Sequence, residues 1–238
     1  MICILFALTE EMEPFANKIG VLSEQQVVGH FRYLTAATAA QRLVLTVTGM
    51  GKVSAAMATQ AVIDRFRPDL IIQAGVAGSL RTDMRAGDVF VASEICQHDV
   101  HMAGTADKWQ SCSHQGQVIY KPNRDALGIA LQVPWPGNSA RFSGRLLTGD
   151  KAVATAKYAD KLRRELSGDA VDMESGAVAQ VACVNNVPFC VLRTISDNAD
   201  EHAMTHFHNN FPHACAVLGE YLYVLFGKLV NEFLLRSE

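Results

Sequence analysis

The chain has 238 residues, of which 49% are hydrophobic and 19% are charged, and its formal net charge is −3. This length and composition are typical of a globular protein that buries a large core. The net charge supplies no positive field for a phosphate backbone, so we expect no nucleic-acid partner. No apolar run approaches the length of a membrane span, so we expect no membrane partner.

The N-terminal segment MICILFAL is apolar, has no basic leader and is soon followed by Glu10, Glu11 and Glu13. It therefore predicts a first strand rather than a signal peptide. The cysteines are scattered without CxxC spacing, which favours reduced, buried thiols in the cytoplasm over disulfides or a zinc site. They are Cys3, Cys96, Cys112, Cys183, Cys190 and Cys215.

Hydrophobic patterns predict alternating strands and helices along the chain. In the first half we expect a strand over Met1–Leu8, a helix over Glu10–Ile19 with Thr9 as N-cap, strands over Val27–Thr35 and Arg42–Thr48 with a hairpin near Gly29, a helix over Lys52–Phe66, and strands over Leu70–Ala74 and Asp88–Ser93. In the second half we expect a long loop over His98–Asn123, strands over Arg141–Leu147, Ala170–Met173 and Phe189–Ile195, and helices over Asp150–Ser167, Glu174–Val184 and Asn209–Leu235.

No linker or change in composition divides the chain, so we expect residues 1–238 to form a single α/β domain with a mixed, twisted sheet and helices on both faces. Ligands of such sheets bind beyond the carboxyl ends of the strands. The residues expected there are Thr9–Glu11, Thr48–Gly51, Gly75–Gly78, Gly149–Asp150, Met173–Glu174 and Ser196–Asp197.

Three motifs identify no ligand by themselves. In TGMGKVSAA, Ser54 stands where a dinucleotide fingerprint requires glycine, and the spacing before Lys52 excludes a Walker A loop. GVAGS, at Gly75–Ser79, would let the backbone approach a flat ligand closely. HAMTHFHNNFPH contains four histidines without HExxH or a cysteine partner, which favours a solvated loop and helix start over a metal site. These histidines are His202, His206, His208 and His213.

Carboxylates form a stronger pattern. Glu11, Glu174 and Asp197 each follow an apolar strand, at positions expected to share one edge of the sheet. Any one of them could serve only to complement a helix dipole. Three together favour one pocket that uses negative charge, whereas Asp172, two residues before Glu174, has no assigned chemical step.

Longer matches extend over nearly the whole chain: FALTEEME, TGMGKVSAA, IIQAGVAGSLRTDMRAGDVFVAS, LLTGD, AVDMESGAVAQVA and VPFCVLRTISDNAD. In order and spacing these segments resemble the methylthioadenosine/S-adenosylhomocysteine nucleosidases of the purine nucleoside phosphorylase superfamily. The resemblance implies a three-layer α/β/α sandwich, a homodimer without metal or organic cofactor, and hydrolysis of adenine nucleosides modified at the 5′ carbon. Substrates of this class include methylthioadenosine, S-adenosylhomocysteine and 5′-deoxyadenosine, as in methionine salvage and nucleoside catabolism.

The resemblance also implies residue roles. Glu11 would activate the attacking water, Asp197 would protonate the purine, and an ionised Glu174 would hold the ribose hydroxyls and stabilise the oxocarbenium ion. Other side chains expected at the substrate are Leu8, Val76, Ala77, Gly78, Ala152, Val153, Val171, Asp172, Met173, Arg193, Ser196 and Phe207.

Some positions depart from the family pattern. Ala152 stands where relatives commonly stack an aromatic residue on adenine, and Val76 replaces a common serine. Segment 98–116, where relatives carry a loop that reaches the neighbouring subunit's site, differs here, with Trp109 as its possible aromatic. Hydrolysis of futalosine or aminodeoxyfutalosine in menaquinone synthesis therefore stays open. A phosphorylase is less favoured because acidic residues follow the first strand, and the three retained carboxylates argue against a storage protein without turnover.

Overall fold

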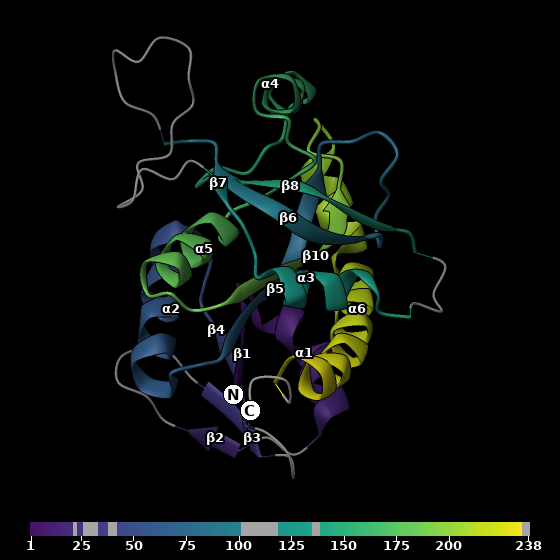
Figure 1. Ribbon diagram of the computed structural model, residues 1–238. Helices are drawn as coiled ribbons and strands as arrows, with labels where there is room; N and C mark the ends of the chain where they lie inside the picture. Colours follow the sequence, from purple (N-terminus) through teal and green to yellow (C-terminus); the bar gives the residue numbers. More distant parts are fainter. Residues whose placement is uncertain (21–22, 26–32, 38–41, 101–118, 135–138, 235–238) are drawn as a thin grey trace.

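A mixed β-sheet forms the centre of the computed structural model, which describes residues 1–20, 23–25, 33–37, 42–100, 119–134 and 139–234 (Figure 1). Within these ranges the sheet has the order β10-β6-β8-β9-β5-β1-β4-β3-β2, with β7 beside β6. Its strands are β1 (Ile2–Phe6), β2 (Ser23–Gln25), β3 (Tyr33–Ala37), β4 (Arg42–Val47), β5 (Leu70–Ser79), β6 (Val89–Gln97), β7 (Ile119–Tyr120), β8 (Arg141–Thr148), β9 (Ala170–Asp172) and β10 (Phe189–Asp197). Because β10 also pairs with β5, the strands β5, β9, β8, β6 and β10 close into a ring.

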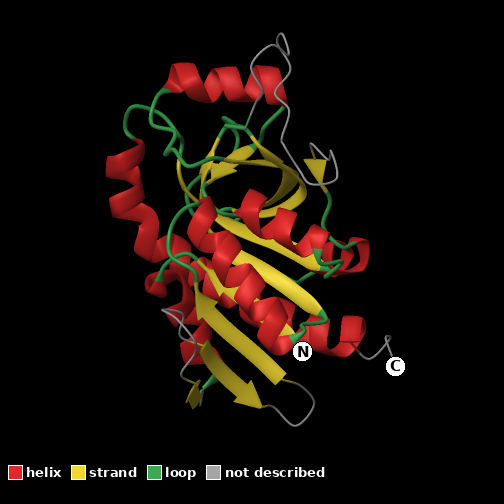
Figure 2. Cartoon of the chain, turned by 90° about the vertical axis from the view of Figure 1, so that its left-hand side faces the viewer, coloured by secondary structure: helices red, strands yellow, loops and turns green. Residues whose placement is uncertain are grey.

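Helices cover both faces of this sheet (Figure 2). They are α1 (Thr9–Ile19), α2 (Lys52–Phe66), α3 (Arg124–Leu131), α4 (Ala156–Leu166), α5 (Ser175–Val184) and α6 (Ala203–Leu229), and a π-helical turn (Val230–Leu234) continues α6. One core lies between the sheet and α1, α3 and α6, and a second lies between the sheet and α2 and α5. Helix α4 packs on a third cluster at one end of the ring. The expected three-layer α/β/α fold is confirmed.

The apolar pattern of β1 shows why this strand belongs in the middle of the sheet. Ile2, Ile4 and Phe6 point into the first core, and Cys3 and Leu5 point into the second. All five are fully buried. A strand covered on both faces needs a continuous apolar run rather than alternation, which the sequence supplies.

The central strands are longer than expected. β5 does not end at Ala74 but continues through GVAGS to Ser79, so the expected end of this strand was wrong. The reason lies in its neighbour β10, whose Arg193 pairs with Gly75 and whose Asp197 pairs with Gly78. The two glycines leave room for these side chains while the backbone stays in the sheet.

Several helix limits also differ from the expectation. Leu8, not Thr9, is the N-cap of α1, and its N–H donates to the carboxylate of Glu11 at 3.0 Å. Helix α4 begins at Ala156 rather than Asp150, because Thr155 caps it by accepting a hydrogen bond from the N–H of Tyr158.

The His-rich segment belongs mostly to α6, which begins at Ala203, and not to a loop. The start of α6 was not predicted because the residues of its first turns are mostly polar. β7 lies inside the loop expected over His98–Asn123, and α3 was not predicted. The expectations about Gly29, Trp109 and Cys112 fall outside the described residues.

Helix α6 with its following turn is long and apolar enough to meet a length-and-hydropathy criterion for a membrane span. However, half of the most apolar part of this helix is buried inside the protein. Leu218, Leu222 and Leu225 lie in the first core together with residues of α1 and the sheet. Burial of one side against α1 and the sheet is the behaviour of a core helix.

Candidate active site

A cavity of about 250 Å³ opens at the carboxyl ends of the central strands. Its walls come from the ends of β1, β5, β9 and β10, from the loop after β8 and from the start of α6. The lining residues are Ala7, Leu8, Glu11, Met50, Val76, Ala77, Gly78, Lys151, Ala152, Val153, Ala154, Val171, Asp172, Met173, Glu174, Ser196, Asp197, Ala203, Met204 and Phe207. Three of the four acids among them, Glu11, Glu174 and Asp197, are those that follow apolar strands in the sequence.

All the candidate site residues line this cavity except Arg193, which lies buried behind its wall. The cavity is also lined by Met50, which lies within the strand end Thr48–Gly51 expected from the sequence, and by residues that the sequence did not single out, namely Ala7, Lys151, Ala154, Ala203 and Met204. Most of them are chain neighbours of candidates. Ala203 and Met204 lie one turn before Phe207 and would have followed from the correct start of α6.

Glu11 is held by the backbone at the end of β1 and along β5. Its Oε2 accepts hydrogen bonds from the N–H groups of Ala7 at 2.9 Å and Leu8 at 3.0 Å, and its Oε1 accepts from Val76 at 2.9 Å. Burial raises the pKa of the Glu11 carboxyl, against the opposing effects of Arg193 and the three N–H groups. A carboxylate has about four acceptor positions, so one remains for a further donor such as water.

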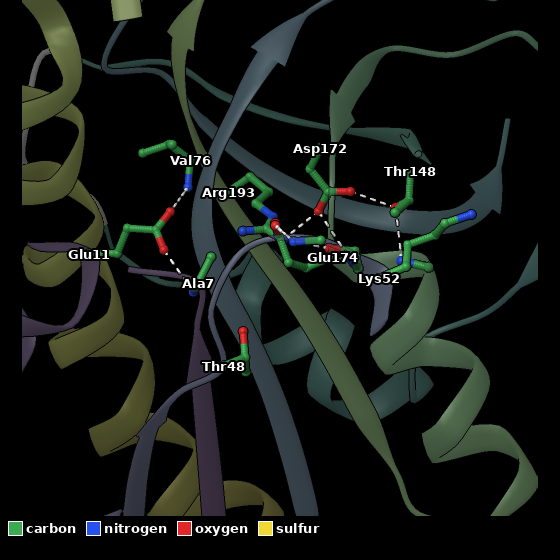
Figure 3. A network of polar contacts seen from close by, with 12 residues as sticks. Ala7, Glu11, Thr48, Lys52, Val76, Thr148, Asp172, Glu174 and Arg193 are labelled. Carbon is green, nitrogen blue, oxygen red and sulfur yellow. Dashed lines mark hydrogen bonds and ion pairs between the residues drawn. The ribbon is translucent and has the colours of Figure 1, made fainter. Parts of the chain in front are cut away.

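Arg193 carries the central positive charge of the site, between Glu11 and Asp172 (Figure 3). Its Nη2 forms a buried ion pair with Asp172, donates to Ser175 Oγ at 2.9 Å and lies 3.8 Å from Glu174 Oε2. Burial disfavours the charge, but Asp172, Glu174 and Glu11 outweigh it and raise the pKa of the guanidinium. The positive charge of Arg193, buried behind the cavity wall, therefore partly compensates the negative charges of Asp172, Glu174 and Glu11.

Asp172 makes three contacts within the protein. Besides Arg193, it accepts hydrogen bonds from the Thr148 hydroxyl at 2.5 Å and from the N–H of Ser175 at 3.1 Å. These contacts tie β9 to β8, to the start of α5 and to β10. Asp172 thus organises the wall, and Glu174, which accepts one hydrogen bond, is the acid of this pair with more acceptor capacity left.

Glu174 is the N-cap residue of α5, and its Oε1 accepts a hydrogen bond from the N–H of Gly51 at 2.9 Å. Burial and the nearby Asp172 carboxylate raise the pKa of Glu174 to about 7, although Arg193 and the Gly51 N–H act in the opposite direction. The carboxyl therefore changes charge near neutral pH.

Asp197 is the last residue of β10 and also lines the cavity. Its Oδ2 accepts from the Ser196 hydroxyl at 2.8 Å and its Oδ1 from the N–H of Ala199 at 2.9 Å. Burial raises the pKa of Asp197 against these two hydrogen bonds. A raised pKa favours the protonated acid, which is the form that donates a proton.

Apolar side chains form the rest of the cavity. Ala152 and Val153 lie in the wall after β8, and Val76 lies beside Glu11. Phe207 is the one aromatic residue among the described lining residues. Within the described part of the chain, no group of three His, Cys, Asp or Glu side chains is placed to hold a metal ion.

A second, wider cleft of about 730 Å³ lies on the far side of Asp197. Much of its charge is already paired, since Arg81 binds Asp83 and Asp169, and Arg163 binds Asp160. The wider cleft is lined by Asp160, Asp197 and Asp200, of which Asp160 is paired with Arg163 and Arg164. The smaller cavity is lined by Glu11, Glu174 and Asp197, each of which lies at or just after the end of a buried strand, so it is the better candidate for chemistry.

Comparison with known proteins agrees with this geometry. The sequence model of a protein family, the phosphorylase superfamily, matches residues 1–223 of this chain. A 5′-methylthioadenosine/S-adenosylhomocysteine nucleosidase of Staphylococcus aureus is 31% identical over 208 residues, which cover 87% of this chain and 90% of that protein. The Buchnera aphidicola protein of the same name is 28% identical over 230 residues, which cover 96% of this chain and 97% of the relative.

Solved structures share the fold over almost their whole length. A mutant of the Helicobacter pylori nucleosidase with 5′-methylthioadenosine in its active site has a TM-score of 0.90 and 27% identity, covering 96% of this chain and 98% of that one. A structure of Helicobacter pylori futalosine hydrolase also has a TM-score of 0.90, with 28% identity and coverage of 96% and 97%. The Neisseria meningitidis nucleosidase in complex with methylthio-immucillin-A has a TM-score of 0.88, with 26% identity and coverage of 94% and 97%.

Proposed function

We propose that this chain, which belongs to the phosphorylase superfamily and within it to the 5′-methylthioadenosine/S-adenosylhomocysteine nucleosidases, hydrolyses the N-glycosidic bond of adenine nucleosides modified at the 5′ carbon. The products would be adenine and the 5′-modified ribose. One observation carries this proposal: Glu11, Glu174 and Asp197, from three separate strand ends, line one small cavity. Such an arrangement can supply a base, an electrostatic stabiliser and an acid around one bond.

Asp197 would act on the leaving base. A purine departs more easily when N7 is protonated, since it then leaves as a neutral molecule. Burial raises the pKa of Asp197, which favours the protonated form that this step requires. The N–H of Ala199 on Oδ1 and the hydroxyl of Ser196 on Oδ2 would hold the carboxyl in a fixed orientation.

Glu174 would act on the sugar. As the glycosidic bond breaks, positive charge develops on the ribose, and an ionised carboxylate beside the 2′ and 3′ hydroxyls stabilises it. The carboxylate of Glu174 accepts one hydrogen bond, from the N–H of Gly51 to Oε1. Its other acceptor positions remain for the ribose hydroxyls. Because burial and Asp172 raise the pKa of Glu174 to about 7, this carboxylate is available at and above neutral pH.

Glu11 would activate the attacking water. Its three backbone contacts fix the carboxylate beside β5, and its remaining acceptor position can take a proton from water. General-base assistance of this kind is commonly worth about 10²–10⁴-fold in rate. The other candidate residues, from Leu8 to Phe207, would shape the pocket around base, ribose and 5′ group.

The lining of the cavity argues for water over phosphate as the nucleophile. Phosphorolysis requires an anion site, for which arginine is the preferred residue. Among the described lining residues Lys151 is the one cationic side chain, and Arg193 is already paired with Asp172. Glu11 at the end of β1 would repel an anion.

Futalosine-type nucleosides are a second candidate substrate class. The Helicobacter pylori futalosine hydrolase matches this chain with the same TM-score as the nucleosidase from that organism. Ala152 also leaves the wall after β8 without an aromatic ring, so the base site itself imposes little selection.

A homodimer is proposed as well. Met50, which precedes α2, is 64% exposed, and Val53 and Met57 on one side of α2 are 70% and 59% exposed, an unusual degree for large apolar residues. Met50 also lines the cavity, so a subunit covering this side would lie close to the substrate. The mass of the purified protein by light scattering tests this proposal.

A cytoplasmic place in methionine salvage is the proposed setting. All five described cysteines are free thiols, which agrees with a reducing compartment.

One panel of substrates tests the function. Base release would be measured with methylthioadenosine, S-adenosylhomocysteine, 5′-deoxyadenosine, aminodeoxyfutalosine, futalosine, adenosine and inosine. We expect release of adenine from the 5′-modified adenine nucleosides. Preference for futalosine or aminodeoxyfutalosine would select the second candidate, and no release from any compound would refute the proposal.

A further inference from the structure

A ring of hydrogen bonds lies behind the cavity wall and has no part in the steps above. The N–H of Lys52 donates to Asp150 Oδ1 at 2.7 Å, and the N–H of Asp150 donates to Asp99 Oδ2 at 2.8 Å. The ammonium of Lys52 closes the ring by binding Asp99 Oδ1 at 2.6 Å. We refer to Lys52, Asp99 and Asp150 as the α2 clamp, because they fix the first residue of that helix.

The clamp is directly continuous with the candidate active site. Gly51 immediately precedes Lys52, and its N–H donates to Glu174 Oε1 at 2.9 Å. Two successive N–H groups at the start of α2 are therefore bound by two carboxylates, Glu174 in the cavity and Asp150 behind it. A contact that fixes the N–H of Lys52 also fixes the neighbouring N–H of Gly51.

The backbone conformation at Gly51 requires a glycine. Its φ of 87° lies in the left-handed region, and an added Cβ would lie only 3.1 Å from Asp150 Oδ1. The close approach of Asp150 therefore depends on glycine at this position. The glycine motif that matched no nucleotide fingerprint has a structural explanation here: it brings the start of α2 against two acids.

Charge and burial indicate that the ion pair of the clamp persists in solution. The side chains of Lys52 and Asp99 are 17% and 27% exposed, so water and salt screen them less than a surface pair. Burial opposes the charge on Asp99, but the ammonium of Lys52 and the N–H of Asp150 lower the pKa of its carboxyl.

The clamp also reaches the helix that Glu174 caps. Lys52 Nζ donates to Gln97 Oε1 at 3.3 Å, and the amide of Gln97 donates to Gln180 of α5 at 2.7 Å. On its other side, Asp150 directly precedes Lys151–Ala154, which line the cavity. The same contacts thus join the ribose side of the site to the wall after β8.

We propose that Lys52, Asp99 and Asp150 are positioning residues, which hold the N–H of Gly51 on Glu174 and thereby orient this carboxylate toward the ribose. This inference rests on the proposed function, because it takes Glu174 as the group that binds the ribose hydroxyls. None of the three residues contacts the substrate in this account.

A pair of substitutions at Asp150 tests the inference. Asp150→Ala removes the acceptor of the Lys52 N–H, whereas Asp150→Asn keeps an oxygen at that place. We expect kcat to fall about 10- to 100-fold in Asp150→Ala, the worth of one hydrogen bond to a charged group, and to recover largely in Asp150→Asn.

The pH dependence supplies a readout that a purely structural role would not change. Asp172, Arg193 and Glu11 face Glu174 in both proteins, but the Gly51 N–H, which lowers the pKa of Glu174, is loosened in Asp150→Ala. The acidic limb of the kcat profile should therefore move to higher pH. Lys52→Met removes the ammonium but keeps the hydrogen bond from the backbone N–H of residue 52 to Asp150 Oδ1. It should move the acidic limb in the same direction.

Asp160→Ala is the matched control, because Asp160 lies on exposed α4 and pairs with Arg163 and Arg164. It should retain the kcat and the pH profile of the parent protein. Parent-like kcat and limb in Asp150→Ala and Lys52→Met would overturn the inference, whatever their melting temperatures. Equal loss in Asp150→Ala and Asp150→Asn would overturn it too. Failure of the parent protein to release any base would instead refute the proposed function.

Discussion

Arg193 crosses β5 at the position where Gly75 has no side chain. A Cβ atom at Gly75 would lie 2.0 Å from Arg193 Nη1 and 2.7 Å from Glu11 Oε1. Real Cβ atoms do not approach other atoms so closely, so any larger residue must displace both charged groups. The geometry of Glu11 therefore depends on a glycine in the middle of a strand.

Gly75→Ala should consequently lower kcat by at least about tenfold, since displacement of Glu11 removes part of its general-base assistance. The measurement is steady-state kinetics on the preferred nucleoside, with circular dichroism to confirm folding. Gly128→Ala is the control, because no atom lies within 4 Å of an added Cβ in α3. Alanine there should preserve activity and stabilise the helix by about 0.5–1 kcal/mol. Equal activity of the two variants would contradict this account of Gly75.

Glu174 should reduce stability when it is ionised. Its pKa is raised from 4.5 to about 7 in the folded protein, so the folded state binds the proton more tightly than the unfolded chain. The contribution is absent below the unfolded value and grows as pH rises through this window. Glu174→Gln should therefore be more stable than the parent protein above the folded pKa, by up to about 3 kcal/mol, while turnover is lost.

Urea unfolding across the pH range measures the difference between these two proteins. The gain in the free energy of unfolding should disappear below the unfolded value of 4.5. A gain that does not change with pH would show that Glu174 keeps its ordinary pKa in the fold.

Glu11 and Glu13 lie on the same helix but in opposite environments. Glu11 is buried with three backbone partners, whereas Glu13 is exposed. Glu11→Gln should lower kcat by about 10²–10⁴-fold without unfolding the protein. Glu13→Gln should leave kcat unchanged, and near-normal turnover by folded Glu11→Gln would remove Glu11 from the mechanism.

Asp197 can be tested through the leaving group. Asp197→Asn cannot donate a proton, so release of adenine should fall by about 10²–10⁴-fold. A riboside with a p-nitrophenolate leaving group needs no proton and should be cleaved by Asp197→Asn and by the parent protein at similar rates. Equal losses on both substrates would mean that Asp197 binds or orients the substrate and does not act as the acid.

The strand ends, and with them the carboxylates, were predictable from the sequence because the central strands are apolar on both faces. The strand β1, for example, ends at Phe6, and Glu11 lies in the first turn of the helix α1 that follows. Parallel neighbours in a buried sheet bring such residues to one edge, as β1, β5 and β10 do for Glu11 and Asp197. Glu174 was grouped with them on the same expectation, but it reaches this edge because β9 runs antiparallel to the last residues of β5.

Other features depend on contacts between distant segments. The continuation of β5 through Gly75 and Gly78 was missed because the space beside these glycines is filled by side chains of β10. No local sequence pattern reveals such a contact. Which acid pairs with Arg193 follows from the ring formed by β5, β9, β8, β6 and β10, and not from spacing. The start of α6 was missed because His206 and His208 lie on exposed first turns that resemble a loop in composition.

The central claim is that water attacks the ribose while an adenine base departs. The most direct measurement is mass spectrometry of the sugar product formed by the purified protein from methylthioadenosine in water labelled with heavy oxygen, with and without phosphate. We predict one labelled oxygen on the anomeric carbon and the same rate in both conditions. A strict requirement for phosphate, with an unlabelled ribose 1-phosphate as product, would contradict it.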